Sequence, residues 1–223
     1  MTRNTPAGRP DTLELTELLL TRFCHDISGP VSAVSNGMEL LDSTDANDED
    51  MVAQVQELIV SSSAESFARL QTYRIAFGRI NTEGDSNLDE FRDILQRYFL
   101  QGKIELEWGD GPVKILNLRI NNQVRRIAAN MILAVAALLP FGGVIEVSQD
   151  IDTQHRKHLQ VVGSSSRVKS GEELSAIVRD KGGVEVDVKN VPWFYMAELA
   201  RGHGIDITFA EEKERVLLRA VYT

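Results

Sequence analysis

Cysteine is almost absent from this chain of 223 residues, in which Cys24 is the single example. One thiol excludes an intramolecular disulfide and any zinc site built from several cysteines, and it fits a reducing compartment. Histidine is scarce as well. Of the four histidines, only His155 and His158 lie close together, and the Arg and Lys between them favour a solvated turn over a metal site. The sequence therefore predicts no metal ion bound by this chain.

The chain also lacks an excess of positive charge and a long apolar run. Its 24 Lys and Arg face 33 Asp and Glu, giving a formal charge of −9, which argues against nucleic acid as a partner. The most apolar stretch, residues 128–141, has only about a dozen apolar residues, whereas a helix that crosses a membrane needs about 20. The first residues, "MTRNTPAGRPDTLELTE", lack the apolar core of a secretion signal. We expect a soluble cytoplasmic protein that binds no membrane.

Two long amphipathic helices are predicted in the first third of the chain. After a disordered lead-in at 1–10, Asp11 or Thr12 should cap the first helix. Apolar residues then follow a seven-residue repeat with alternating steps of four and three: Leu20, Cys24, Ile27, Val31, Val34, Met38 and Leu41. The acidic break "DSTDANDED" at 42–50 separates this helix from a second one, whose stripe runs over 52–80. Together they predict an antiparallel hairpin at 11–81.

A hairpin of only two helices leaves much of its apolar stripe in water, so pairing two copies into a four-helix bundle is expected. We therefore predict a homodimer. In this bundle Cys24 would be a small core residue. In the C-terminal half of the chain, Trp193, Phe194 and Tyr195 are expected to begin a helix that packs on a sheet. Gly37, which is unfavourable inside a helix, predicts a close approach either of the second helix or of the other subunit.

The pattern changes after a linker at 81–87, and residues 88–223 predict an α+β domain with helices against a mixed sheet. Helices are expected at 88–100, 122–140, 171–181 and 191–202. Strands are expected at 103–108, 113–118, 144–149, 158–164, 205–210 and 215–222.

His25 draws attention because it stands at an outward b position of the first repeat. A neutral imidazole has a free ring nitrogen that can accept a phosphoryl group. Arg22, Ser28 and Gly29, three or four residues away, share its face and offer a cation and room for a partner. Pro30 cannot bond the carbonyl of residue 26, so the helix should bend or loosen there. A merely solvated histidine on a wet helix face is the alternative.

A resemblance favours the chemical role. "HDISGP" is similar to the phosphoacceptor box of two-component histidine kinases, in which the histidine lies on the first helix of a dimeric hairpin. The chain from 12 to 223 more closely resembles the alphaproteobacterial histidine phosphotransferases of the ChpT type, with "CHDISGPVSAVSNGMELL" as the most specific segment. The resemblance implies that residues 88–223 form an α/β sandwich like the ATPase domain of histidine kinases.

The sequence departs from the kinase pattern where nucleotide would bind. Asn130 is present, but Ala134 stands where a second asparagine is expected. The segment "VVGSSSR" at 161–167 lacks the aspartate that holds adenine, and "VKNVPWFYMAELA" lacks the glycines of a phosphate loop. Without these groups, tight ATP binding has no evident physical basis. We expect no cofactor in this chain and a degenerate ATPase-like domain that serves as a docking surface.

The resemblance implies a relay between receiver-domain aspartates. A nitrogen of His25 would take the phosphoryl group from the receiver domain of a hybrid histidine kinase and pass it to response regulators, and the receivers would supply Mg²⁺. Asp26 would orient or polarise the imidazole, with plain solvation as the alternative. Pro30 would be structural. The residues expected to contact the receiver are Arg22, Ser28, Gly29 and Ser32. An autophosphorylating kinase and a non-catalytic dimeric scaffold that binds response regulators remain alternatives.

Overall fold

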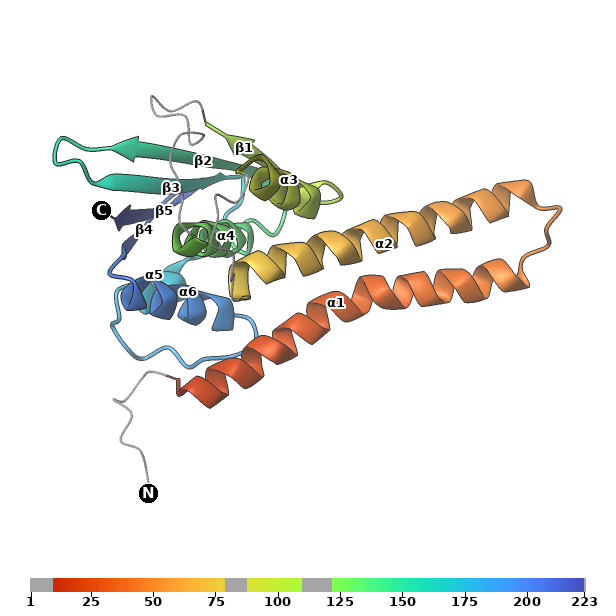
Figure 1. Ribbon diagram of the computed structural model, residues 1–223, viewed down its shortest axis with the longest axis horizontal. Helices are drawn as coiled ribbons and strands as arrows, with labels where there is room; N and C mark the ends of the chain where they lie inside the picture. Colours follow the sequence, from red (N-terminus) through yellow and green to blue (C-terminus); the bar gives the residue numbers. More distant parts are fainter. Residues whose placement is uncertain (1–9, 79–87, 110–121, 223) are drawn as a thin grey trace, which may run out of the picture.

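Two long helices dominate the computed structural model, which describes residues 10–78, 88–109 and 122–222. Helix α1 spans Thr12–Ser43 and α2 spans Glu49–Phe77, and the two form an antiparallel hairpin (Figure 1). The side chain of Asp11 caps α1 by accepting a hydrogen bond from the backbone N–H of Glu14 at 2.8 Å. The predicted hairpin and its N-terminal cap are therefore confirmed, whereas the lead-in at 1–9 and the linker at 81–87 lie outside the described residues.

Close packing of α1 on α2 is made possible by Gly37. A Cβ atom added to this buried glycine would lie 2.6 Å from Cγ1 of Ile59 on α2, which is closer than carbon atoms approach in folded proteins. Because Ile59 belongs to the same chain, Gly37 serves the contact between the two helices of the hairpin. This resolves the two alternatives left open by the sequence.

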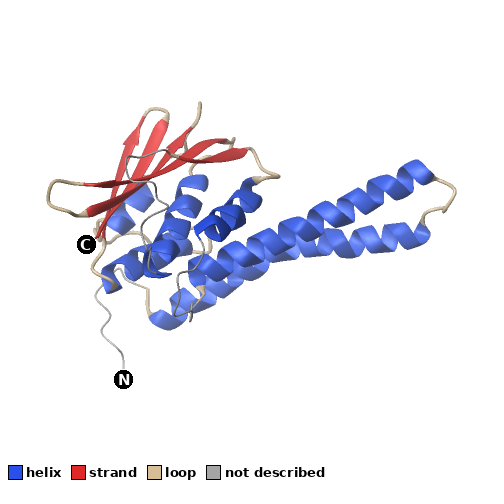
Figure 2. Ribbon diagram, turned by 45° about the horizontal axis from the view of Figure 1, so that its top comes forward, coloured by secondary structure: helices blue, strands red, loops and turns tan. Residues whose placement is uncertain are grey.

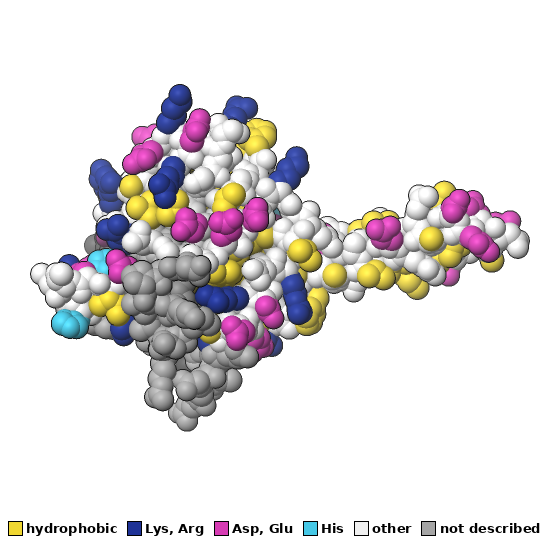
Figure 3. Space-filling model, turned by 90° about the horizontal axis from the view of Figure 1, so that it is seen from above, with side chains coloured by type: hydrophobic (Ala, Val, Ile, Leu, Met, Phe, Trp, Pro, Cys, Tyr) yellow, Lys and Arg dark blue, Asp and Glu magenta, His cyan; other side chains and the backbone are white. Residues whose placement is uncertain are grey.

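One edge of the predicted stripe on α1 does not face α2. Cys24 is exposed, and Val31 and Met38 are 50% and 48% exposed. In the single chain α1 turns its neighbouring face, with Pro30 and Gly37, toward α2, so the place of Cys24 in the core of a four-helix bundle stays a prediction. Figure 3 shows further hydrophobic side chains along the projecting arm of the hairpin, with acidic ones toward its tip.

The C-terminal part is a two-layer sandwich of a mixed sheet and helices. The strands are β1 (Ile104–Trp108), β2 (Gly143–Ile151), β3 (Lys157–Ser164), β4 (Asp206–Glu212) and β5 (Arg215–Tyr222). Their order is β1-β2-β3-β5-β4; β1 and β2 are parallel, and the other pairs are antiparallel. The helices are α3 (Leu88–Phe99), α4 (Asn122–Ala136), α5 (Glu172–Val178) and α6 (Val191–Gly202). They gather on one face of the sheet (Figure 2).

This arrangement confirms the predicted α+β fold with a mixed sheet. The expected strand at 113–118 lies outside the described residues. The expected helix at 191–202 is α6, and its Trp193 and Phe194 are both only 5% exposed within the core. Within the described ranges, every helix is too short or too polar to span a bilayer.

The core lies between the sheet and α4. Met131, Ile132 and Val135 of α4 are completely buried, and so is Ile145 of β2. The same core extends to Ala76 near the end of α2, which is also fully buried. The base of the hairpin is therefore packed into the C-terminal layer, and its outer part projects into solvent (Figure 1).

Candidate functional site

His25 lies on the half of α1 that is close to the C-terminal layer and points into solvent. Its side chain is 81% exposed, as the outward b position predicts. Helix α1 continues through Pro30 without a break, and Figure 1 shows it changing direction near its middle. The expected bend is therefore present, and the phosphoacceptor candidate stands on continuous helix.

Asp26 contacts the histidine ring although it is the next residue along the helix. Nδ1 of His25 lies 3.2 Å from Oδ1 of Asp26. An ionised carboxylate can only accept hydrogen bonds, so this contact requires the ring proton to be on Nδ1. The lone pair is then on Nε2, which is the nitrogen free to react.

The second oxygen of Asp26 is held by two donors. Nε of Arg22 and the hydroxyl of Tyr73 each donate to Oδ2 at 2.6 Å, and the Asp26 side chain is only 10% exposed. Burial works to raise the pKa of this carboxyl group, but the hydrogen bonds from Tyr73, Arg22 and His25 outweigh it and hold the pKa below its ordinary value. Asp26 is therefore an anion whenever the protein is near neutral pH.

The backbone of Asp26 has a partner on α2 as well. Pro30 has no N–H, so the carbonyl oxygen of residue 26 loses its usual helical donor. Nη1 of Arg69 donates to this oxygen at 3.2 Å. Two hydrogen bonds to Oε1 of Glu65, at 2.9 and 2.5 Å, hold the Arg69 guanidinium in place. The contact compensates for the proline, which explains why the helix continues through it.

Tyr73 is fixed by aromatic packing at the base of the hairpin. It is 6% exposed, and its ring centroid lies 5.9 Å from that of Phe23, 5.5 Å from Phe77 and 6.3 Å from Tyr98. Burial, with a further contribution from Tyr98 and the hydrogen bond to Asp26, raises the pKa of the Tyr73 hydroxyl far above its ordinary value. Tyr73 therefore stays protonated and remains a donor.

The remaining predicted site residues lie in two environments, one exposed beside His25 and one partly buried beside Asp26. Ser28, Gly29 and Ser32 are exposed with His25, and an added Cβ at Gly29 would meet no atom within 4 Å. Arg22 differs, since it turns toward Asp26 and also approaches the carbonyl oxygen of Val188 at 3.5 Å. Its side chain is 34% exposed, so part of the guanidinium still reaches solvent.

Asn130, the one asparagine that matches the kinase pattern, is engaged in structure. It is 2% exposed, and its Nδ2 donates to the backbone oxygens of Ala76 at 2.8 Å and Arg126 at 2.7 Å. The first bond joins α4 to the end of α2. Asn130 thus holds the hairpin against the C-terminal layer, with its amide group turned to the backbone.

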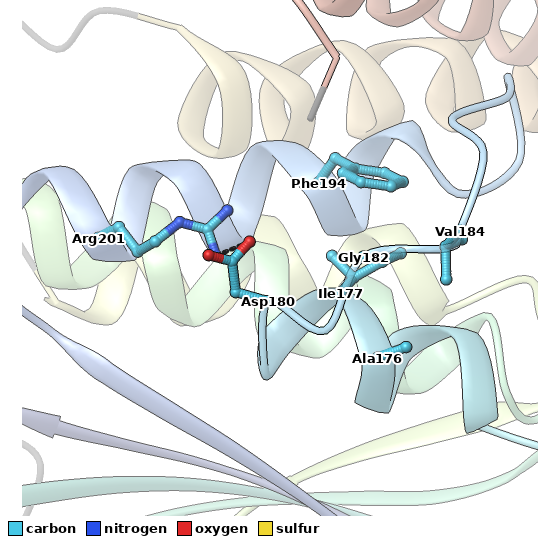
Figure 4. A pocket seen from close by; sticks show the side chains of 7 residues that line it. All are labelled: Ala176, Ile177, Asp180, Gly182, Val184, Phe194 and Arg201. Carbon is cyan, nitrogen blue, oxygen red and sulfur yellow. Dashed lines mark ion pairs between the residues drawn. The ribbon is translucent and has the colours of Figure 1, made fainter. Parts of the chain in front are cut away.

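The loop between α5 and α6 closes over a very small space. A cavity of about 10 Å³ lies between Ala176, Phe194 and Gly182, and Asp180 and Arg201 form an ion pair of 4.0 Å beside it (Figure 4). This volume is about the least that can hold one water molecule. Among the described residues, no three His, Cys, Asp or Glu side chains are grouped to hold a metal ion.

Two residues of the site, Arg69 and Tyr73, were not predicted. Tyr73 falls in the apolar stripe of the second helix, a position that indicates packing, and Arg69 stands outside that stripe. The sequence does contain a signal for Arg69. Pro30 leaves a carbonyl oxygen on one helix of the hairpin without its helical N–H donor, and a cation on the other helix can donate in its place.

The fold and the site define a class of protein. A solvent-facing histidine on a helical hairpin, in contact with a buried carboxylate and joined to an α/β sandwich, is the arrangement expected of a histidine phosphotransfer protein. Residues 88–215, more than half of the chain, match the family model described as histidine phosphotransferase C-terminal domain.

Individual relatives narrow the class. The chain is 34% identical over 212 residues to protein phosphotransferase ChpT of Brucella abortus (strain 2308), covering 93% of this chain and 95% of the relative. The structure is similar to one described as a bacterial phosphotransferase, with a TM-score of 0.74, 26% identity and coverage of 95% and 97%. The chain belongs to the ChpT-type histidine phosphotransferase family. A weaker similarity, with a TM-score of 0.45 at 11% identity, is to a blue-light activated histidine kinase of Erythrobacter litoralis EL346 (89% and 59% covered).

Proposed function

We propose that this phosphorelay histidine phosphotransferase carries the phosphoryl group on Nε2 of His25. The observation that carries the proposal is the pairing of His25 with Asp26: the buried anion binds Nδ1–H, and the ring beyond it is 81% exposed. A nucleophile must be both unprotonated and reachable by the partner. Nε2 of His25 meets both conditions.

In the forward step, the Nε2 lone pair of His25 attacks the phosphorus of an aspartyl phosphate on a receiver domain. The N–P bond forms as the P–O bond to the aspartate breaks, and the aspartate leaves as a carboxylate. Because Nδ1 keeps its proton, the ring gains a positive charge, which the Asp26 carboxylate at 3.2 Å stabilises. In the return step, a carboxylate oxygen of a second receiver attacks the phosphorus, and the N–P electrons return to Nε2.

The receiver domains of a hybrid histidine kinase and of response regulators would dock around His25. Ser28, Gly29 and Ser32 form the open surface beside the ring, and Gly29 leaves space for the partner backbone. Arg22 positions Asp26 through its Nε and offers the exposed part of its guanidinium to the phosphoryl group. The receiver would supply Mg²⁺ together with its own carboxylates.

We further propose that the protein is a homodimer formed by the hairpin. Exposed apolar side chains on both helices support this, among them Val31 at 50% and Phe67 at 55%. Sedimentation equilibrium should give twice the chain mass of 24.8 kDa. Phe67→Glu should shift the protein to monomer, because it places a charge in the apolar interface proposed between the two hairpins. Leu100→Glu, at an 80% exposed position just after α3, is the matched control and should remain dimeric.

The C-terminal domain is proposed not to bind ATP. Asn130 donates its amide to the backbone, and Ala134 offers no ligand atom. A ligand at a hundred times its dissociation constant stabilises a protein by about 2.7 kcal/mol. We therefore expect millimolar Mg-ATP to leave the melting temperature unchanged in a scanning fluorescence assay, with an intact histidine kinase as positive control. A rise of several degrees would favour the autophosphorylating kinase instead.

The test of the proposed function is transfer from a phosphorylated receiver domain without added ATP. We expect the phosphotransferase to take up the labelled phosphoryl group and then to pass it to a second receiver. A scaffold that only binds response regulators would bind both receivers and stay unlabelled, so the same experiment separates the two functions.

A further inference from the structure

The Asp26 carboxylate has two sides with different neighbours. Oδ1 faces Nδ1 of His25 in the exposed part of the site, and Oδ2 faces Arg22 and Tyr73 in its interior. Rotation of the carboxylate about its Cβ–Cγ bond would exchange or misalign these contacts. The group that restrains Oδ2 therefore determines how Oδ1 meets the histidine ring.

Of the two donors to Oδ2, Tyr73 is the more rigid. Arg22 lies on the same helix four residues away, on a long side chain that is 34% exposed. Tyr73 comes from α2, is 6% exposed, and is packed among Phe23, Phe77 and Tyr98. A planar ring held on three sides fixes the position of its hydroxyl, whereas water can compete for the arginine.

Arg69 adds a main-chain contact four residues before Tyr73 on the same helix. Its bond to the carbonyl oxygen of Asp26, at 3.2 Å, holds the backbone where Pro30 has removed the usual donor. Helix α2 thus fixes residue 26 twice, once at the side chain and once at the main chain. Both contacts cross from one helix of the hairpin to the other.

We infer that Tyr73 is a positioning residue for phosphoryl transfer: its hydroxyl orients the Asp26 carboxylate, which in turn keeps the proton of His25 on Nδ1 and the lone pair on Nε2. The inference rests on the proposed role of His25 as the carrier. Tyr73 does not touch the reacting atoms, and it acts through Asp26. Groups that orient a metal-binding histidine are commonly worth 10- to 100-fold in affinity or activity, and we expect an effect at the lower end of that range here.

Tyr73→Phe is the decisive variant, since it removes the hydroxyl and keeps the ring. We expect the rate of phosphoryl transfer from a phosphorylated receiver to His25 to fall about tenfold. We also expect the ¹⁵N chemical shifts of the His25 ring, measured on the full-length protein at a pH where the ring is neutral, to change from one tautomer to a mixture. The cavity of about 50 Å³ that Tyr73 and Arg22 help to line can admit water where the hydroxyl is removed, so the melting temperature should fall only slightly.

Tyr195→Phe is the matched control for structural loss. Its hydroxyl donates to the carbonyl oxygen of Phe77 at 3.3 Å, and its ring packs on Phe77 at 5.3 Å, but it makes no contact with Asp26. This variant should transfer at the wild-type rate with unchanged His25 shifts.

Three outcomes would overturn the role of Tyr73: wild-type rate in Tyr73→Phe, slow transfer with unchanged ring shifts, or equal slowing in Tyr195→Phe. An unlabelled wild type would instead refute His25 as the carrier, and the ring shifts would still report whether Tyr73 orients Asp26.

Discussion

His25→Ala is expected to abolish phosphoryl acceptance and to leave the fold intact. The His25 side chain is 81% exposed, and among the described residues its polar contact is with Asp26, so its removal disturbs little packing. Asp26 keeps both donors to Oδ2 and remains paired. The change therefore deletes the nucleophile without opening a cavity, and the loss of labelling should be complete.

The measurement compares wild type and His25→Ala on Phos-tag gels after mixing with a phosphorylated receiver from a hybrid kinase, without ATP. His203→Ala is the control, because His203 is also exposed and lies at the end of α6. The control should be labelled at the wild-type rate, and the circular dichroism of all three proteins should agree. Labelling that persists in His25→Ala would remove His25 from the mechanism.

Periodicity explains why so much of this site could be predicted from the sequence. The seven-residue repeat fixed the outward direction of His25, and the structure has it 81% exposed. The same repeat places Cys24 in the core of a four-helix bundle, and in the single chain it is exposed because α2 covers the neighbouring face of α1. A repeat distinguishes an apolar face from a polar one, but it does not say which part of that face a neighbouring helix covers.

The contacts that organise the site could not be obtained in this way. Tyr73 and Arg69 meet Asp26 across separations of 47 and 43 residues, and these pairings depend on the register between two helices. Register here is set by the fit of Gly37 against Ile59, which is a matter of three-dimensional packing. The same holds for Asn130, which matches one position of the kinase nucleotide box but donates its amide to the backbone oxygens of Ala76 and Arg126.

Asp26→Asn should slow phosphoryl acceptance about a hundredfold, because it reverses the hydrogen bonding at the histidine. Arg22 and Tyr73 are both donors at Oδ2, so they retain the amide oxygen and turn the NH₂ group toward His25. An NH₂ group donates, so Nδ1 must then accept, and the ring proton moves to Nε2. The reactive nitrogen thereby loses its lone pair, although the shape of the site is kept.

The same variant should lose about 1–2 kcal/mol of unfolding free energy at neutral pH, because charged hydrogen bonds to a buried carboxylate become neutral ones. The native pKa of Asp26 lies below its ordinary value, so its stabilising contribution is complete above about pH 5 and is lost as the pH falls through the native pKa. Urea unfolding of both proteins from pH 7 to pH 3 should therefore show their difference shrinking in acid. Equal stabilities at pH 7, together with wild-type transfer in Asp26→Asn, would mean that this carboxylate neither supports the fold nor orients His25.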